Sequence, residues 1–364
     1  MNYKETLFLV GKCLTISHNE RNKALIKKEL TSGNVDWDNV VKLSTAHYVF
    51  PALYCNLKRC GFLIFLPEDL VSYMKHITDL NRERNKQIIA QAKEINKLLL
   101  SNNITPIFLK GTGNLLEGLY EDIAERMVGD IDFIINPNDY ENVVKLFEEK
   151  NYKFVQDLKY QFASFKHYPR IHHNEKIAAV EIHKEITIEK YAKEFNFNNV
   201  SRNSQLINDV KVLGYNDQLC LSIIAKQIND NGYQYKDISF RNAYDVFLLS
   251  QKVCSRESIK NFNKLKQPLN TFLAISHTCL GNVSSITYQN NKQTAKDLKK
   301  FNKLVLDRKF RDRYRSRISK SIYFKSRLNI IIKSILNKDY RFWLIKRLTD
   351  REFRRQIKES KLKP

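Results

Sequence analysis

The spacing of apolar residues predicts that the first hundred residues are helical. Asp36-Trp37-Asp38 has the acidic residues that favour a helix start, and apolar positions then recur at three- and four-residue intervals. A second helical pattern begins at Pro67-Glu68-Asp69 and continues for about thirty residues, until Asn102-Asn103 interrupts it. We therefore expect an N-terminal helical region over residues 1–103.

Between residues 104 and 200 the pattern changes to short strands that alternate with helices. Runs rich in β-branched and aromatic residues predict strands, whereas apolar residues three and four apart predict helices. The expected elements are strands at 104–109, 130–135 and 153–155, helices near 112–120 and 140–147, and a hairpin of strands 162–172 and 177–186 that turns at 173–175.

Helical patterns return in the C-terminal half of the chain, over residues 205–290 and again over 291–364. The sequence therefore predicts an α+β fold in which a small mixed sheet is flanked by N-terminal and C-terminal helical regions. The predicted units are an N-terminal helical region (1–103), an α/β core (104–200), a helical region packed on the core (201–290) and a basic helical tail (291–364).

The net charge of +23 is concentrated in this tail. Residues 291–364 carry 25 Lys and Arg against 7 Asp and Glu, a net of +18, so the rest of the 364-residue chain is only mildly basic. Aromatic residues such as Tyr314, Tyr323 and Trp343 lie among the cations. Three interpretations stay open: the tail binds RNA by base stacking and phosphate neutralisation, lies on an anionic membrane, or covers the body as a helical cap.

The hydrophobic stretches and the cysteines favour a cytoplasmic protein. The apolar run near the N-terminus, Leu7 to Val10, is too short for a signal peptide, and lysines interrupt the other apolar stretches, so no transmembrane segment is expected. The six cysteines are scattered without a C-x-x-C pair, which is typical of reduced thiols. His167, His172 and His173 match no zinc template.

Asp130-Ile131-Asp132 is the strongest candidate for chemistry. In a strand, alternate side chains share a face, so both carboxylates point one way while Ile131 and Phe133 point into the core. The two α-carbons then lie about 6.6 Å apart, close enough for both carboxylates to reach one hard cation. Because like charges held this close repel each other, we expect the pair to bind a metal ion. The alternative is a strand-end pair that faces solvent.

Glu181 is a third carboxylate within an apolar, β-rich run that ends at His183. The predicted hairpin would lay this strand near Asp130 and Asp132 in one sheet. Three such carboxylates can hold two Mg²⁺ ions, which activate an attacking oxygen and neutralise a triphosphate. Alone, Glu181 is also consistent with a surface acid on an edge strand. His183 shares its face and could orient a substrate or transfer a proton, or could simply be packed.

Lys110-Gly111-Thr112-Gly113 lies where the first predicted strand gives way to a helix. Glycines at this point let backbone N–H groups approach an anion, and a helix N-terminus favours negative charge. Lys110 and Thr112 could add a cation and a hydroxyl for phosphate. A plain strand-to-helix turn is the alternative for so short a motif.

Together and in this order, the motifs resemble the nucleotidyltransferase superfamily that includes DNA polymerase β and the aminoglycoside nucleotidyltransferases. The resemblance spans residues 30–250 and is strongest to a branch described as an uncharacterised nucleotidyltransferase family. Its matching segments are the helical opening from Asp36 to Leu53, the turn Phe108-Leu109-Lys110-Gly111, Tyr120, Arg126, the core Gly129-Asp130-Ile131-Asp132, the strand Val180-Glu181-Ile182-His183 and the helix at Tyr244-Asp245-Val246.

The resemblance implies a metal-binding role for the three carboxylates. Asp130, Asp132 and Glu181 would bind two Mg²⁺ ions, with Mn²⁺ as a possible substitute, and Glu181 would help to remove the proton of the attacking hydroxyl. The chain departs from the wider superfamily in having Gly111-Thr112 where Gly-Ser or Gly-Gly is usual, in a longer spacing from this turn to Asp130, and in Glu181 where Asp is common.

The resemblance also implies how phosphate is held. Lys110, Gly111 and Thr112 would contact the β- and γ-phosphates of an NTP. Arg126 would lie near the site, where its planar guanidinium suits a phosphate or an acidic acceptor. The alternative for Arg126 is a loop arginine paired with Glu121 or Glu125.

The expected activity is therefore transfer of an NMP from an NTP, such as ATP, to an acceptor hydroxyl with release of pyrophosphate. The acceptor stays open among small molecules, sugars, RNA and protein hydroxyls. One alternative is a metal-dependent glycosyltransferase that uses Asp130 and Asp132 as its D-x-D pair, which would have a long nucleotide-binding α/β region upstream. The other is a non-catalytic binding protein that acts through residues 291–364.

Overall fold

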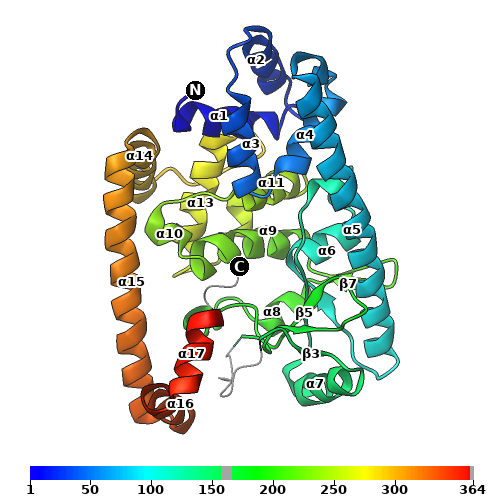
Figure 1. Cartoon of the computed structure of the whole chain (residues 1–364), viewed down its shortest axis with the longest axis vertical. Helices are drawn as coiled ribbons and strands as arrows, with labels where there is room; N and C mark the ends of the chain where they lie inside the picture. Colours follow the sequence, from blue (N-terminus) through cyan, green and yellow to red (C-terminus); the bar gives the residue numbers. More distant parts are fainter. Residues whose placement is uncertain (157–165, 361–364) are drawn as a thin grey trace.

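Helices at both ends of the chain flank a seven-stranded mixed sheet (Figure 1). The computed structural model describes residues 1–156 and 166–360. One continuous buried core joins the sheet to helices on both sides of it. The predicted α+β architecture, a small mixed sheet between helical regions, is confirmed.

The N-terminal region consists of α1 (Tyr3–Cys13), α2 (Glu20–Thr31), α3 (Trp37–Ala46), α4 (Phe50–Arg59), a short 3-10 turn (Phe62–Phe65) and α5 (Glu68–Leu100). As the sequence indicates, Asp36 caps α3 by accepting a hydrogen bond from the backbone N–H of Asn39. The α5 helix has 33 residues, a length of about 50 Å, and extends beside the sheet (Figure 1). Gln91 of α5 exchanges two hydrogen bonds with the backbone of Ala178 and so fixes the helix to the sheet.

The sheet has the spatial order β3-β4-β5-β2-β1-β7-β6. The central strand β2 pairs in parallel with β5 and antiparallel with β1, and β1 pairs in parallel with β7. The strands are β1 (Ile107–Phe108), β2 (Asp130–Ile134), β3 (Lys153–Phe154), β4 (Ile171–His172), β5 (Ala179–His183), β6 (Gln205–Ile207) and β7 (Val210–Val212). Two helices cross between strands of this part of the chain, α6 (Lys110–Glu117) and α7 (Tyr140–Glu149).

Two expectations about the sheet need correction. Residues 205–212, expected to be helical, form the β6–β7 hairpin, in which Asn208 and Asp209 both have positive φ angles, 47° and 63°, as a tight two-residue turn requires. Of the strand expected at 162–172, the described residues 166–172 form β4 and a single bridge between His167 and His183, and residues 162–165 lie outside the described part of the chain. The turn at 173–175 and the strand that follows it are as expected.

The helices after the sheet are α8 (Phe197–Arg202), α9 (Tyr215–Ile224), α10 (Gly232–Tyr235), α11 (Phe240–Leu249), α12 (Ser255–Ser258) and α13 (Lys266–Cys279). A π-helical turn, Ala225–Asn229, prolongs α9. Nearly every residue of α11 is buried, and this helix packs against α9. The α11 helix therefore lies inside the body, where its polar residues must find partners within the protein.

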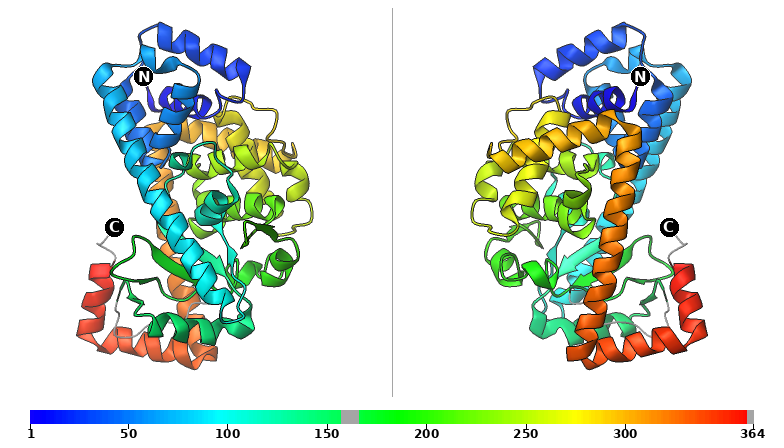
Figure 2. Two further views of the ribbon diagram at one scale, coloured as in Figure 1. Left: turned by 90° about the vertical axis from the view of Figure 1, so that its right-hand side faces the viewer. Right: turned by 90° about the vertical axis from the view of Figure 1, so that its left-hand side faces the viewer.

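The basic tail forms α14 (Lys292–Leu306), α15 (Arg308–Leu336), α16 (Lys338–Thr349) and α17 (Arg351–Ser360). Of the described tail residues, only those of α14 join the continuous core. The 29-residue α15 runs along one side of the body (Figure 2). It is held there by a hydrogen bond from Tyr314 to the backbone of Gln234 and by the ion pairs Arg315–Asp237 and Lys333–Glu189. None of the described helices is both long enough and apolar enough to cross a membrane.

Candidate active site

The parallel pairing of β2 with β5 places two of the predicted carboxylates side by side. Asp132 lies directly opposite Glu181 in the register, and Asp130 lies opposite Ala179. The residues between them, Ile131 and Val180, are completely buried on the other face of the sheet. The strand alternation expected from the sequence is therefore present in both strands, and it directs the acidic side chains to one face.

His183 binds both of these carboxylates from the end of β5. Its Nε2 lies 2.9 Å from Oδ1 of Asp132 and 3.4 Å from Oε2 of Glu181, and the side chain is completely buried. Its other nitrogen, Nδ1, is buried and has no hydrogen-bond partner among the described residues. This geometry suits an imidazole whose Nε2 carries a proton and donates it to Asp132.

Lys110 brings a positive charge to the same pair of carboxylates. Its Nζ lies 2.5 Å from Oδ1 of Asp132 and 3.4 Å from Oε2 of Glu181. The backbone of Lys110 has a φ of +52°, a left-handed conformation that is uncommon for a lysine and marks a constrained position at the start of α6. Burial lowers the pKa of Lys110, but the charges of Asp132 and Glu181 outweigh burial and raise it overall, so the lysine stays protonated.

The pKa values of the Glu181 and Asp130 carboxyl groups are shifted in opposite directions. Burial raises the pKa of Glu181, but the hydrogen bond from His183 and the charge of Lys110 lower it overall, well below the usual range. Burial raises the pKa of Asp130, and the nearby carboxylates of Asp132 and Glu181 raise it further, against the opposing charge of Arg170. Glu181 is therefore ionised at neutral pH and available to a cation.

Two cations of the site were not predicted from the sequence. Arg170 lies 3.1 Å from Oδ1 of Asp130. Lys166 is buried, and burial together with the charge of Lys110 lowers its pKa to about 8 although Asp132 and Glu181 act in the opposite direction. Lys166 and Arg170 are four residues apart in the expected hairpin strand, so strand alternation would place both on one face, and this spacing is the signal in the sequence that could identify them.

The glycines of the turn at 110–113 are required by close packing. A Cβ atom at Gly113 would lie 2.7 Å from the backbone oxygen of Phe108, and one at Gly111 would lie 2.9 Å from the side chain of Val128. Thr112 is buried, and its hydroxyl donates to the backbone oxygen of Asp130 at 2.9 Å. Thr112 therefore connects α6 to β2, while Lys110 is the residue of this turn that contacts the carboxylates.

Arg126 lies behind this turn and pairs with α11. Its Nε contacts both carboxylate oxygens of Asp245, at 3.0 and 3.1 Å, and Tyr120 donates to the same carboxylate at 2.7 Å. Arg126 therefore pairs with Asp245 and not with Glu121 or Glu125, which was the alternative expected from the sequence. Arg126 and Asp245 are both buried, and Arg126 lies against Gly111, so this ion pair supports the turn from within the protein.

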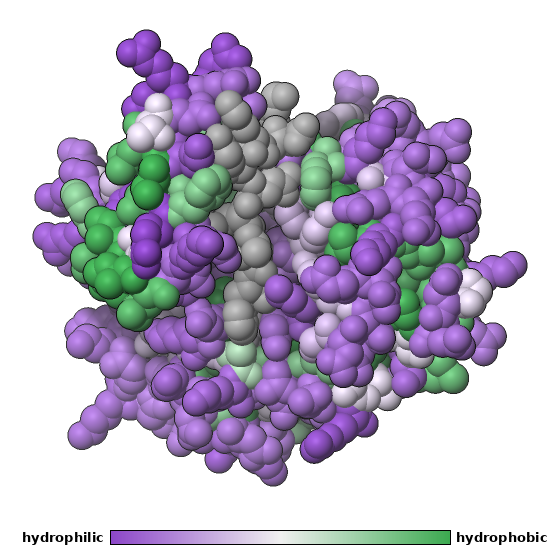
Figure 3. Space-filling model, turned by 90° about the horizontal axis from the view of Figure 1, so that it is seen from below, coloured by the Kyte–Doolittle hydropathy of each residue, from purple (hydrophilic) through white to green (hydrophobic). Residues whose placement is uncertain are grey.

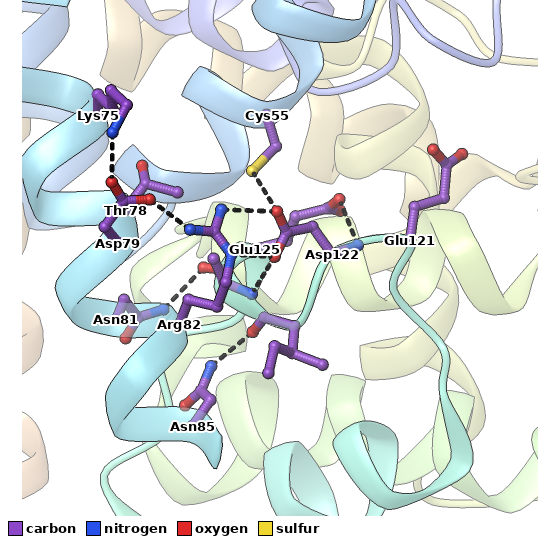
Figure 4. A network of polar contacts seen from close by, with 12 residues as sticks. Cys55, Lys75, Thr78, Asp79, Asn81, Arg82, Asn85, Glu121, Asp122 and Glu125 are labelled. Carbon is purple, nitrogen blue, oxygen red and sulfur yellow. Dashed lines mark hydrogen bonds and ion pairs between the residues drawn. The ribbon is translucent and has the colours of Figure 1, made fainter. Parts of the chain in front are cut away.

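A network of polar contacts fixes the loop that carries Arg126 (Figure 4). Arg82 of α5 makes two hydrogen bonds to the carboxylate of Asp122, and Asn85 of α5 donates to the backbone oxygen of Arg126 at 2.7 Å. Glu125, which is buried, pairs with Arg59 of α4 and accepts a hydrogen bond from Tyr244. These contacts join the N-terminal helices to the residues just before β2 and so position Asp130 and Asp132.

The acidic cluster fits a divalent cation. One ligand atom from each of Asp132, Glu181 and His183 lies within 4.8 Å of the others, and Asp130 is two residues from Asp132 on the same face. Carboxylate oxygens are the ligands that Mg²⁺ prefers. A metal-binding histidine normally donates its second N–H to a partner, which Nδ1 of His183 lacks among the described residues. The carboxylates are therefore the better ligands, and His183 is better suited to orienting them.

A cavity of about 540 Å³ lies where residues of α1, α3, α11 and α15 meet. Arg241, which lines it, is four residues before Asp245 in α11 and so occupies the same side of that helix. Its guanidinium stacks on Tyr48 at 4.9 Å from the ring centre. Lys42 of α3, Lys226 and Arg315 of α15 add further cations to the lining. Asp230 and Asp237 also line it, and Asp237 pairs with both Lys226 and Arg315, so the lining is mixed with an excess of cations.

Comparisons with known proteins identify a family but assign no reaction. Among curated proteins, none matches the chain. The solved structure of JHP933 from Helicobacter pylori is similar to 69% of this chain and covers 97% of its own, with 13% sequence identity and a TM-score of 0.30. The family described as uncharacterised nucleotidyltransferase matches residues 33–279, about two thirds of the chain, and the protein belongs to that family.

Proposed function

We propose that the protein is a metal-dependent nucleotidyltransferase that moves a nucleoside monophosphate from an NTP to an acceptor hydroxyl and releases pyrophosphate. The observation that carries the proposal is the pairing of Asp132 with Glu181 across two parallel strands, with Lys110 in contact with both. Membership of a nucleotidyltransferase family supports this interpretation of the cluster. In the reaction, the acceptor oxygen bonds to the α-phosphorus, the bond to the β-phosphate oxygen breaks, and pyrophosphate leaves.

Asp130, Asp132 and Glu181 would hold Mg²⁺ or Mn²⁺, which neutralises the triphosphate and lowers the pKa of the attacking hydroxyl. His183 and Lys110 orient Asp132 and Glu181 before substrate binds, and both lower the pKa of Glu181. Lys110 can then pair with the β- and γ-phosphates at the start of α6, because its side chain reaches the carboxylates from that turn. Glu181 would accept the proton of the acceptor once Lys110 has moved to the phosphates, because the contact with Lys110 is one of the causes that hold the pKa of Glu181 low.

The cavity that Arg241 lines is our candidate site for the part of the acceptor that lies away from the reacting hydroxyl, because none of the acidic cluster lines it. Arg241 and Lys226 line it, and Tyr48 offers an aromatic surface at its edge. A volume of about 540 Å³ is within the range of small-molecule sites. A small acceptor that carries an anionic group would match this lining better than a neutral one. We propose that such a molecule supplies the hydroxyl.

The glycosyltransferase alternative has less support from the fold. A D-x-D glycosyltransferase would need a nucleotide-binding α/β region before Asp130. Residues 1–106 are all described and contain helices but no strand. Turnover of a nucleotide sugar in the absence of NTP turnover would nevertheless favour that alternative over ours.

Calorimetric titration of Mg²⁺ and each NTP tests the proposal. The wild type is compared with Asp132→Asn and Glu181→Gln, and with Glu83→Gln, which changes an exposed carboxylate of α5, as the matched control. We expect metal-dependent NTP binding in the wild type and the control, and at least a tenfold loss of affinity in both site variants. Equal, metal-independent binding by all four proteins would contradict the proposal.

A further inference from the structure

A row of large apolar side chains lies exposed along the second half of α15. Phe324, Leu328, Ile331 and Ile335 recur at intervals of four, three and four residues, so they share one side of the helix. Their exposed fractions are 69%, 58%, 51% and 67%. Single exposed apolar residues are common on protein surfaces, but a continuous row of this kind marks a contact surface.

The last turns of α16 and the end of α15 extend this surface. Ile345 and Leu348 of α16 are also more than half exposed, and Leu336 at the end of α15 is 86% exposed. In the view from below, hydrophobic side chains gather among hydrophilic ones at the left of the molecule, where the tail helices lie in Figure 1 (Figure 3). We call the apolar row of α15 together with these residues of α16 the tail surface.

The tail surface faces away from the body of the protein. Arg315 and Lys333 are eighteen residues apart, five full turns, and both pair with acids of the body, Asp237 and Glu189. Phe324 is nine residues, two and a half turns, from each of them and therefore lies on the opposite side of α15. The two ion pairs thus hold the helix so that its apolar row points outward.

Cations continue the same row toward the start of α15. Arg313, Arg317 and Lys320 precede Phe324 at the same three- and four-residue intervals. In all, α15 contains ten Lys and Arg and a single acidic residue, Asp312. One side of the helix is therefore cationic in its first half and apolar in its second half.

We propose that the tail surface docks the protein on an anionic lipid bilayer, with the cations at the headgroups and the apolar row at the acyl boundary. Apolar residues and lysine or arginine on one exposed helix are the features of a helix that lies in a membrane interface. This inference does not depend on the proposed nucleotidyl transfer, because it uses none of the residues of the acidic cluster.

Other occupants fit these side chains less well. RNA would neutralise the cations, but bases stack on aromatic rings, and Leu328, Ile331 and Ile335 are aliphatic. A second copy of the chain would bring two strongly basic helices together, which like-charge repulsion opposes. An anionic bilayer is the partner that satisfies the charge and the aliphatic row at once.

Flotation of the full-length protein with lipid vesicles tests the proposal. The vesicles contain phosphatidylcholine alone or phosphatidylcholine mixed with anionic phosphatidylglycerol. The variants are Leu328→Ser/Ile331→Ser in the apolar row, Arg317→Gln/Lys320→Gln in the cationic row, and Ile64→Ser as the matched control, because Ile64 is 82% exposed in the N-terminal region. Circular dichroism verifies that each variant keeps the wild-type fold.

We expect the wild type and the control to float with the anionic vesicles and not with phosphatidylcholine alone, and added salt to weaken this binding. Both pairs of substitutions should reduce binding by about tenfold. No flotation of a folded wild type, or flotation that the apolar substitutions leave unchanged, would overturn the proposal. A wild-type dimer that is lost in Leu328→Ser/Ile331→Ser would also overturn it, because the apolar row would then bind a second copy of the chain. Tight binding of single-stranded RNA by both the wild type and this variant would overturn it as well, because the cations would then serve RNA.

Discussion

The buried Arg126–Asp245 pair allows a decisive test of what Arg126 does. The substitution Arg126→Met keeps much of the side-chain volume but removes the charge and both contacts with Asp245. If the arginine supports the turn at Lys110 and Gly111 from within, the cost appears in protein stability. If it binds nucleotide directly, as the family resemblance implies, the cost appears mainly in NTP affinity.

The magnitude follows from the burial of the pair. Arg126 and Asp245 are both almost completely inaccessible to solvent, so the substitution leaves the carboxylate of Asp245 buried without its cation. Removal of one partner of a buried ion pair costs about 3–5 kcal/mol. The hydrogen bond from Tyr120 to Asp245 persists and holds the cost toward the lower end.

The sign of the pH dependence is also fixed. Burial raises the pKa of Asp245, and Arg126 opposes this shift, so loss of Arg126 raises the pKa further. A carboxyl group whose pKa is raised by folding favours the folded state at low pH and loses that contribution as the pH rises through its folded pKa. The stability difference between wild type and Arg126→Met should therefore be smaller at pH 5 than at pH 8.

Urea unfolding followed by circular dichroism measures the effect, with Arg308→Met as the control. Arg308 has the same kind of side chain but is 87% exposed, in a weak surface pair with Asp312, so its loss should leave the unfolding midpoint almost unchanged. Similar unfolding slopes for the variants are required for the comparison. Equal stability of the two variants, together with a tenfold loss of NTP affinity in Arg126→Met alone, would refute the structural role.

Two further predictions concern the turn and the buried lysine. Gly113→Ala should destabilise the protein by about 1–3 kcal/mol, because its Cβ would collide with the backbone oxygen of Phe108, whereas Gly129→Ala, which meets no atom within 4 Å, should be nearly neutral in the same unfolding assay. Burial lowers the pKa of Lys166 to about 8 in the folded protein, whereas an unfolded lysine has a pKa of about 10.4. Between about pH 8 and about pH 10.4 the unfolded chain therefore binds more protons than the folded protein. The wild type should gain stability relative to Lys166→Met as the pH rises through this window. A pH-independent difference between these two proteins would contradict the burial of the ammonium group.

Local pattern was sufficient to predict the elements that carry the acidic cluster. Asp130 and Asp132 alternate with completely buried residues in β2, and Glu181 does the same in β5, so period-two alternation identified both strands and the shared face. The α5 helix and its start at Pro67 were likewise evident from apolar spacing. These patterns can be recognised in a single sequence because each depends on residues only a few positions apart.

Contacts between distant residues were not predictable in the same way. Arg126 and Asp245 are 119 residues apart, and nothing in the local sequence of either one indicates the other. The β6–β7 hairpin was missed because strands of three residues are too short to give a periodic pattern, although Asn208-Asp209 is a turn signal. The exposure of the apolar row on α15 follows from how that helix is held against the body, and sequence periodicity alone does not report it.

Transfer from an NTP labelled with radioactive phosphorus tests the central claim most directly. The purified protein is incubated with Mg²⁺, an extract that contains candidate acceptors, and an NTP labelled at either the α- or the γ-phosphate. The account predicts that the α-label enters a new product, that the γ-label is released in pyrophosphate, and that Asp132→Asn and Glu181→Gln abolish both events. Entry of the γ-label into the product, or transfer that both variants perform as well as the wild type, would contradict it.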